Sequence, residues 1–275
     1  MSRLLTYRVT VALACLLAAG PACFSVPAGE PEQETQAIPG ADELIRSVLA
    51  GFPAVPITIS AELQSRNSRG DVEKKLNVEI MLDWHGRTPS ARYTIRDAFG
   101  KNLEGLTVKP SRSGPSSYRY FQGEALVASK LPDLSRKIQD TDFTWNDLSL
   151  SFLWWPNGST AGLEEVKGRR CYVVDLPAPE GTDSGDSGVR VWVDPQAHML
   201  LQAAAYDAGG RRTRLLQVKS FKKINKVWMI QNLDMQSFPS GHKTVMRVRQ
   251  VETPEDKAKK TAADDTDTLD IRPVE

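Results

Sequence analysis

The sequence has few cysteines, which limits what can stabilise it. Its 275 residues include three: Cys15, Cys23 and Cys171. Cys15 lies within an apolar N-terminal run, and cleavage after Ala28 would leave Cys171 alone in the mature chain. A single thiol cannot form an internal disulfide, so the packed core must stabilise the domain. Cys171 lies in an alternating run beside Tyr172, which favours a small buried hydrophobe over a nucleophile.

The residue patterns of common catalytic sites are also missing. The three histidines, His85, His198 and His242, lie at or near predicted turns, where we expect solvated side chains. They do not have the two-histidine spacing of a metal site, and no cysteine pair offers zinc ligands. The sequence contains no Gly-x-Ser-x-Gly elbow and no phosphate-binding glycine loop. We therefore predict that the protein is not an enzyme and has no metal or cofactor.

An excess of one charge is absent too. Lysine and arginine number 35 against 34 aspartates and glutamates, a formal net charge of +1. This balance does not suggest a nucleic-acid partner or a strongly acidic target. A basic hairpin is the local exception, and we interpret it as a solvated edge that resists strand addition. Contact with anionic lipid headgroups or an acidic partner is the alternative. Its residues are Arg211, Arg212, Arg214, Lys219, Lys222, Lys223 and Lys226.

Long hydrophobic runs are limited to one, near the N-terminus. Val9–Ala19 follows Arg3 and Arg8 and is shorter than the roughly 20 residues of a membrane span. Its length is typical of a signal peptide, so we predict a signal peptide over residues 1–28 and export to the periplasm. Cys23 after Ala22 offers an alternative, lipidation and a membrane tether.

The predicted domain lies between two polar segments. Residues 29–39 form an acidic, proline-containing spacer, and residues 254–275 are rich in Asp, Glu, Lys and Thr, so we expect both to be disordered. Residues 40–253 are long enough for one domain with a substantial core.

Alternating apolar residues are what this domain has in abundance. Apolar side chains at every second position predict strands with one covered face, and short turns between them require antiparallel pairing. Six such runs follow one another: Arg170–Pro177, Val189–Asp194, Met199–Tyr206, Thr213–Lys222, Val227–Gln236 and Lys243–Val251. The first half predicts further strands over Val55–Ser65, Leu76–Trp84, Ala91–Arg96, Leu103–Lys109, Tyr118–Gln122 and Leu126–Ser129. About a dozen strands in this order make a mainly β fold, a barrel or half-barrel.

Two segments have helical character instead. Ala41–Ala50 places apolar residues at helical spacing before Gly51 and Pro53 end the run. Leu134–Trp155 predicts one or two short helices, with the spacing of a capping box between Thr144 and Asp147. Its aromatic end, residues 152–155, would either pack against the sheet or cover the open end of a barrel.

The motifs of the second half resemble a known family. They are Thr141-Asp142-Phe143-Thr144-Trp145-Asn146-Asp147-Leu148, Gly168-Arg169-Arg170-Cys171-Tyr172-Val173-Val174, Val191-Trp192-Val193-Asp194, Ala205-Tyr206-Asp207-Ala208-Gly209-Gly210, Val227-Trp228-Met229-Ile230 and Gly241-His242-Lys243-Thr244. In this order, over roughly Phe143–Glu252, they are similar to the uncharacterised branch of the bacterial outer-membrane lipoprotein-sorting proteins, which have the LolA/LolB-like fold. The resemblance implies an incomplete antiparallel barrel with a helical lid and a hydrophobic cavity for acyl chains.

We therefore hypothesise a monomeric periplasmic protein that holds acyl chains of lipids or lipoproteins by burial. An envelope-stress sensor or scaffold that binds a membrane-protein partner with the same fold is the alternative. Alternation predicts the cavity lining, and a slip of one residue would invert any strand of it. The predicted lining and lid residues are Ile57, Ile59, Leu63, Val78, Ile80, Leu82, Trp84, Phe152, Trp154, Trp155, Val191, Met229 and Leu233.

Overall fold

The computed structural model describes residues 38–85, 88–112, 114–180, 185–224 and 227–256. The predicted signal peptide with Cys23, the spacer through Ala37 and residues 257–275 of the predicted tail lie outside the described residues. Within the described part, no helix is long and apolar enough to cross a membrane.

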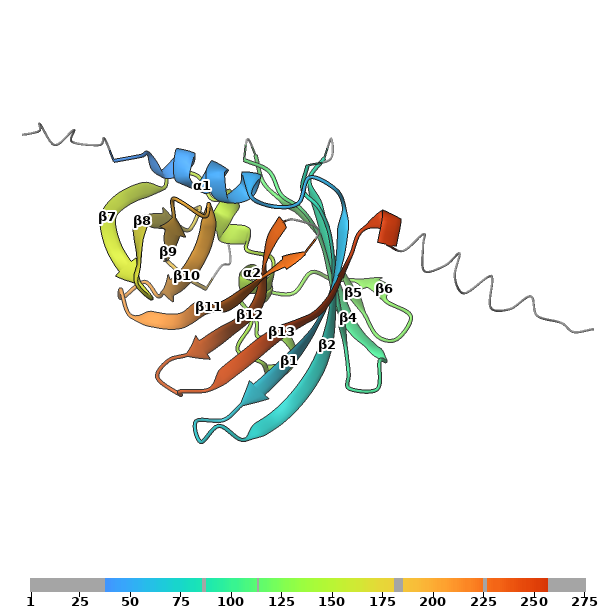
Figure 1. Ribbon diagram of the computed structural model, residues 1–275. Coiled ribbons are helices and arrows are strands. Elements are labelled where there is room, and N and C mark those ends of the chain that lie inside the picture. The colour runs from blue at the N-terminus through green and yellow to red at the C-terminus, as the bar shows by residue number, and fades with distance from the viewer. Residues whose placement is uncertain (1–37, 86–87, 113, 181–184, 225–226, 257–275) are drawn as a thin grey trace, which may run out of the picture. The chain divides into compact units, whose positions relative to one another are not determined.

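Thirteen strands build the domain (Figure 1). They are β1 (Ile57–Arg66), β2 (Val72–Asp83), β3 (Ser90–Arg96), β4 (Asn102–Lys109), β5 (Ser117–Gln122), β6 (Val127–Ser129), β7 (Ser159–Val166), β8 (Arg169–Pro177), β9 (Gly188–Asp194), β10 (Met199–Tyr206), β11 (Arg212–Ile224), β12 (Val227–Ser237) and β13 (Lys243–Glu252). The helices are α1 (Ala41–Ala50), η1 (Ile138–Asp140), α2 (Trp145–Leu148) and η2 (Ser151–Trp154).

All thirteen strands belong to one antiparallel sheet. Its order is β6-β5-β4-β3-β2-β1-β13-β12-β11-β10-β9-β8-β7, so the first and last strands of the chain pair at its centre. In that central pairing Leu63 on β1 lies opposite Met246 on β13. Among the described residues β6 and β7 have one neighbouring strand each, and the sheet therefore stays open. The predicted incomplete antiparallel barrel is confirmed.

The six runs of the second half correspond to β8–β13 within one or two residues at each end. The strand missed from the sequence is β7, at the edge of the sheet. Its alternation is hidden because Gly162 interrupts it at a positive φ of 143° and Glu164 and Glu165 follow. An edge strand has only one neighbour to pack against, so it needs less apolar surface than a central strand.

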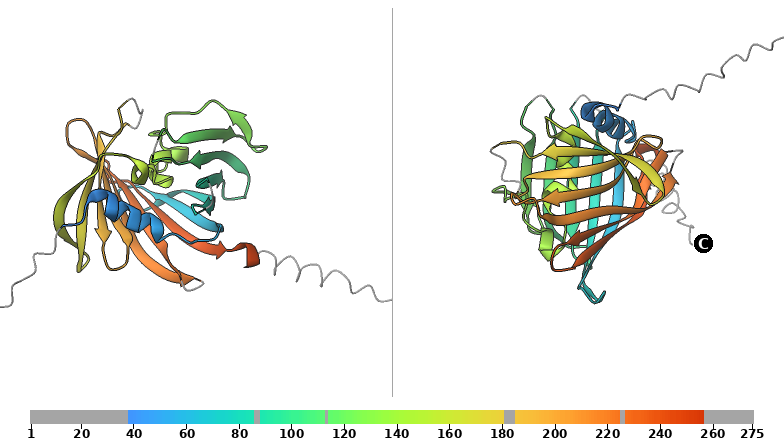
Figure 2. Two further views of the ribbon diagram at one scale, coloured as in Figure 1. Left: turned by 90° about the horizontal axis from the view of Figure 1, so that it is seen from above. Right: turned by 90° about the vertical axis from the view of Figure 1, so that its left-hand side faces the viewer.

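The sheet curves around one main core. One register row crosses five strands on the inner face, from Ile59 through Ile80, Tyr93 and Leu106 to Tyr120. All five side chains are buried, as alternation requires for one covered face. Helix α1 and the segment containing α2 pack against this face (Figures 1 and 2). Helix α1 has the bounds that the sequence predicted.

A smaller core lies on the other face of β8–β11. It contains Cys171, which is fully buried next to Val173, Trp192 and Leu201. Burial raises the pKa of the Cys171 thiol to about 11. The interpretation of this cysteine as a buried hydrophobe is confirmed.

The helical segment between β6 and β7 contains several short helices. The predicted capping box is present in α2: the Thr144 hydroxyl accepts a hydrogen bond from the Asp147 amide, and the Asp147 carboxylate accepts one from the Thr144 amide. Leu150 adopts a left-handed φ of 50° and separates α2 from η2. This break allows Leu148 and Leu153 to face the same core.

Candidate ligand cavity

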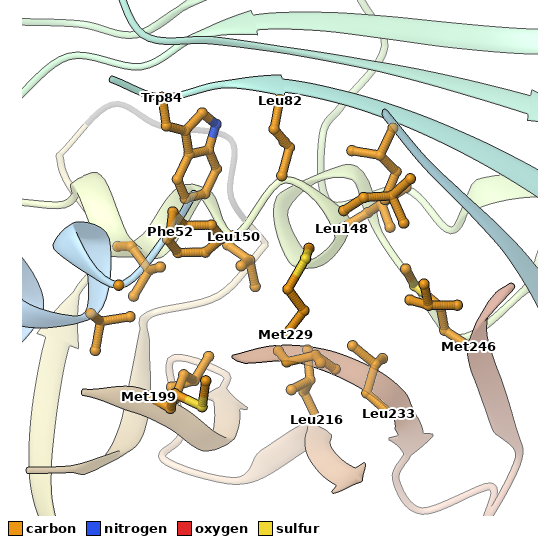
Figure 3. A pocket seen from close by; sticks show the side chains of 18 of the residues that line it. Phe52, Leu82, Trp84, Leu148, Leu150, Met199, Leu216, Met229, Leu233 and Met246 are labelled. Carbon is orange, nitrogen blue, oxygen red and sulfur yellow. The ribbon is translucent and has the colours of Figure 1, made fainter. Parts of the chain in front are cut away.

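The curved sheet and its helices form a partly open cavity of about 150 Å³ (Figure 3). Its walls are almost entirely apolar, and the carboxylate and imidazole side chains among the described residues that line it are those of Asp147 and His198. The other lining residues are Val48, Gly51, Phe52, Pro53, Ile59, Ile80, Leu82, Trp84, Tyr93, Phe143, Leu148, Leu150, Leu153, Met199, Leu200, Leu216, Met229, Ile230, Leu233, Met246 and Val248. Walls of this composition favour apolar groups over water.

The end of α1 closes one side of the cavity. Phe52 follows the helix and packs on Trp84, with 4.1 Å between the ring centroids. The backbone oxygen of Phe52 is also 3.0 Å from Nε2 of His85, which joins this end of the helix to the end of β2. Gly51 permits a close approach to the β9–β10 turn, since a Cβ at this position would lie 3.1 Å from the backbone oxygen of His198. Figure 3 shows Phe52 and Trp84 side by side at the cavity wall.

Six of the predicted site residues line this cavity: Ile59, Ile80, Leu82, Trp84, Met229 and Leu233. Five others belong to the surrounding buried core without lining it: Ile57, Leu63, Val78, Phe152 and Val191. Trp154 and Trp155 are partly buried against that core, and Trp154 lines a second, smaller pocket. All thirteen predicted site residues therefore lie on the inner face of the sheet or in the lid. Six of them line the cavity, and the other seven pack in the core around it.

Several lining residues were missed from the sequence. Leu216 and Met246 lie at alternating positions of β11 and β13, so extending the alternation to those strands would have identified them. Phe52 and His198 lie outside strands, and only the packing of α1 against the β9–β10 turn brings them to the cavity.

A buried ion-pair cluster joins the helical segment to the sheet. Nε of Arg214 on β11 lies 2.8 Å from Oδ2 of Asp147 on α2, and Nη2 lies 2.5 Å from Oδ2 of Asp186. Burial by itself would lower the pKa of Arg214, but both carboxylates raise it. Burial also raises the pKa of Asp186, against the opposing effect of Arg214. The guanidinium therefore remains charged between two carboxylates.

This cluster corrects the interpretation of the basic hairpin. Arg214 was grouped with the solvated cations of β11, yet its side chain is 12% exposed and turned toward α2. The difference arises because α2 covers the sheet at this position of β11, so the Arg214 side chain contacts Asp147 instead of solvent. By contrast, Arg211 is 85% exposed, in agreement with the solvated interpretation.

A second polar connection fixes the segment near β12 and β13. The buried carboxylate of Asp142 accepts hydrogen bonds from the hydroxyls of Ser237 (2.6 Å) and Thr244 (2.8 Å). The Asp142 amide donates to the Thr244 hydroxyl at 2.9 Å. Asp142 therefore has a structural role.

A third connection lies near the other end of the sheet, at β4 and β5, on the same inner face. Glu104 on β4 is buried and accepts hydrogen bonds from the Tyr120 hydroxyl at 2.6 Å and from Arg136 at 2.8 Å. Gln139 of η1 donates to the other carboxylate oxygen at 2.8 Å. Three separate polar contacts thus hold the helical segment against the inner face, and it forms a lid over the cavity.

The described residues contain no cluster of three or more His, Cys, Asp or Glu side chains that could hold a metal ion. His85 and His198 are exposed, and His242 is 41% exposed at 3.9 Å from Glu73. The histidines are dispersed, and the carboxylate of Asp147 at the cavity is paired with Arg214.

Comparisons with known proteins agree with this architecture. A family model described as an uncharacterized protein matches residues 127–260, just under half of the chain. No curated protein matches the sequence.

Solved structures share the fold. A DUF1329 family protein from Desulfovibrio piger has a TM-score of 0.66 at 15% identity, covering 78% of this chain and 91% of its own. An outer membrane lipoprotein-sorting protein domain from Vibrio parahaemolyticus has a TM-score of 0.66 at 14% identity, with coverages of 80% and 97%. A LolA superfamily protein from Nitrosomonas europaea has a TM-score of 0.62 at 14% identity, with coverages of 78% and 94%. The chain therefore has the LolA-like fold that the resemblance predicted, and its similarities are to uncharacterised proteins of that fold.

Proposed function

We propose that this protein binds an acyl chain of a lipid or lipoprotein in the cavity between the sheet and the lid. The observation that carries this proposal is the apolar cavity of about 150 Å³. The pocket is partly open, so its apolar walls lose favourable packing and lie within reach of solvent, and an apolar ligand would cover them.

Burial supplies the binding energy in this proposal. Each methylene moved from water into an apolar site contributes about 0.8 kcal/mol, so about five methylenes contribute roughly 4 kcal/mol, which corresponds to millimolar affinity without a charged contact. Three methionines in the lining, Met199, Met229 and Met246, have flexible side chains that adapt to ligands of different shape. The cavity holds a short segment of chain, since an apolar cavity of about 150 Å³ accommodates one benzene-sized molecule.

The setting that we propose is the periplasm. The predicted signal peptide would export the chain, and the fold shared with the lipoprotein-sorting domain from V. parahaemolyticus supports an envelope role. Cleavage after Ala28 would yield a diffusible carrier, whereas acylation of Cys23 would yield a membrane-tethered acceptor. The chemistry of holding is the same in both cases, and no bond-breaking step is involved.

Native mass spectrometry of the protein purified from the envelope of the expressing cell, periplasm and membranes together, tests the proposal. We expect additional mass that organic extraction removes and that one lipid class accounts for. Extracted protein should regain this mass when the lipid is returned. A protein that carries no lipid before or after incubation would contradict the proposal. Capture of a membrane-protein partner by such lipid-free protein would favour the sensor or scaffold alternative.

A further inference from the structure

Among the described residues, the indole nitrogen of Trp84 has no hydrogen-bond partner. Trp84 follows β2 and is partly exposed, but its Nε1 atom is shielded from solvent and bonds to no group in the described structure. Buried N–H groups are rarely left unpaired, because losing water without gaining an acceptor costs about 1–3 kcal/mol. The rings of Trp84 and Trp154 meet edge to face, with 5.9 Å between their centroids. An aromatic face is a much weaker hydrogen-bond acceptor than an oxygen, so this contact does not replace one.

Trp84 separates two hollows of different character. One is the apolar cavity, where the ring packs on Phe52. The other is a side pocket of about 10 Å³, which also shares Tyr93 with the cavity. Figure 3 shows the nitrogen on the part of the indole turned away from Phe52. The side pocket is lined by Trp84, Ala91, Tyr93, Val108, Pro110, Ser116, Tyr118, Ser149, Ser151 and Trp154.

The side pocket is lined by both polar and apolar side chains and has room for about one oxygen atom. About 10–15 Å³ is the space that a single water needs. Hydroxyl groups of Ser116, Tyr118, Ser149 and Ser151 line it. Ser149 and Ser151 already donate their hydroxyl protons to backbone oxygens of α2, so the indole N–H of Trp84 is, among the described residues, a free donor beside this pocket. The pocket therefore suits a small neutral polar group.

A charged group does not suit this pocket. Neither hollow is lined by a lysine or arginine among the described residues. Burial raises the pKa values of both Tyr93 and Tyr118, so their hydroxyls stay neutral in these surroundings. A buried carboxylate without a cationic partner would carry a large desolvation cost, whereas an ester or amide carbonyl needs only one donor.

We propose that Trp84 and the side pocket form a carbonyl subsite, in which the indole N–H donates to the ester or amide carbonyl of an acyl chain held in the cavity. This inference rests on the proposed acyl-chain function and makes it more specific. The ligand would be a neutral acyl ester or amide, and a free fatty acid anion would be disfavoured. Trp84 would thus be a specificity-determining residue in addition to a wall of the cavity.

Calorimetric titration of the mature protein with octane, methyl octanoate and octanoate at neutral pH tests this subsite. We expect methyl octanoate to bind about three- to tenfold more tightly than octanoate. In Trp84→Phe, which keeps an aromatic ring without the N–H, we expect affinity for methyl octanoate to fall about three- to tenfold more than affinity for octane, which loses only contacts with the larger ring. Trp192→Phe is the control, since Trp192 lies in the smaller core on the other face of the sheet and lines neither hollow. This control should leave both affinities unchanged.

The indole N–H resonance of Trp84 in the wild-type protein gives a second readout that does not depend on how a variant folds. Methyl octanoate should shift this resonance downfield, and octane should not. Equal losses for ester and hydrocarbon in Trp84→Phe, a preference for octanoate, or an unmoved N–H resonance would each overturn the carbonyl subsite while leaving acyl-chain binding intact. Failure of all three ligands to bind the wild-type protein would instead overturn the proposed function.

Discussion

Arg214 on β11 and Asp147 on α2 are 67 residues apart in the sequence and form a buried ion pair, with 2.8 Å between Nε and Oδ2. Asp147 also caps α2 and lines the cavity. The same carboxylate therefore caps the N-terminus of α2 in the lid, holds this helix to the sheet and forms part of the cavity wall. Removing one partner of a buried pair costs far more than the pair contributes, because the other charge remains buried.

Arg214→Met should strongly destabilise the fold. Two carboxylates, Asp147 and Asp186, would lose their cationic partner at 7% and 2% exposure. We expect the free energy of unfolding to fall by about 3–5 kcal/mol in urea denaturation. Arg190→Met is the matched control, since Arg190 pairs with Asp175 at 35% and 41% exposure and should cost about 1 kcal/mol or less. Similar losses in both variants would show that the Arg214 cluster does not anchor the lid.

Thr244→Val tests the connection between the lid segment and β13. Valine keeps the shape of the side chain but removes the hydroxyl that donates to Asp142 and accepts from its amide. We expect a loss of about 1–3 kcal/mol in the free energy of unfolding, because these buried polar groups would lack a partner. Thr107→Val, on a partly exposed position of β4, should change stability by about 0.5 kcal/mol or less. An equally small change for Thr244→Val would contradict the assigned role.

Cys171 should make stability depend on pH in the alkaline range. Its pKa is raised from 9.0 to about 11 by burial, so the thiol remains protonated in the native state at pH values where the unfolded chain ionises. The native state then binds more protons, and stability should decrease from about pH 9 to about pH 11. The free energy of unfolding that Cys171 contributes below pH 9 is thus lost as the pH rises through the native pKa of about 11.

Denaturation curves at several pH values measure this effect, with Cys171→Ala as the control. The variant should show a shallower alkaline decrease than the wild-type protein. Native Cys171 should also react with a thiol reagent at pH 8 only as fast as the protein unfolds. Rapid labelling of the folded protein, or an unchanged alkaline slope in Cys171→Ala, would be inconsistent with the buried thiol.

Much of the sheet could be predicted from the sequence because alternation is a local property. Ile57, Ile59 and Leu63 are all buried on β1 as their spacing required. Alternation states only which face a side chain occupies. It does not show where the face is filled and where it is hollow, and so it cannot separate Ile59 at the cavity from Leu63 behind it.

The polar connections could not be predicted because they join distant parts of the chain. Arg214 in a run of cations looks solvated until α2 is placed over it. Trp84 appeared to continue β2, yet the strand ends at Asp83 and the orientation of the indole depends on Phe52 and Trp154. Such details depend on tertiary packing, which strand periodicity does not encode.

Occupation of the cavity by an acyl chain is the central claim, and a cavity-filling substitution tests it most directly. Figure 3 shows Met229 extending into the middle of the cavity, whereas Met81 on the same sheet is 44% exposed and does not line it. Methyl octanoate should bind Met229→Trp at least about tenfold more weakly than the wild-type protein, because the indole would occupy the space of the ligand. Met81→Trp should bind it like the wild-type protein. Unchanged binding in a folded Met229→Trp protein would show that the ligand lies elsewhere and would contradict the account.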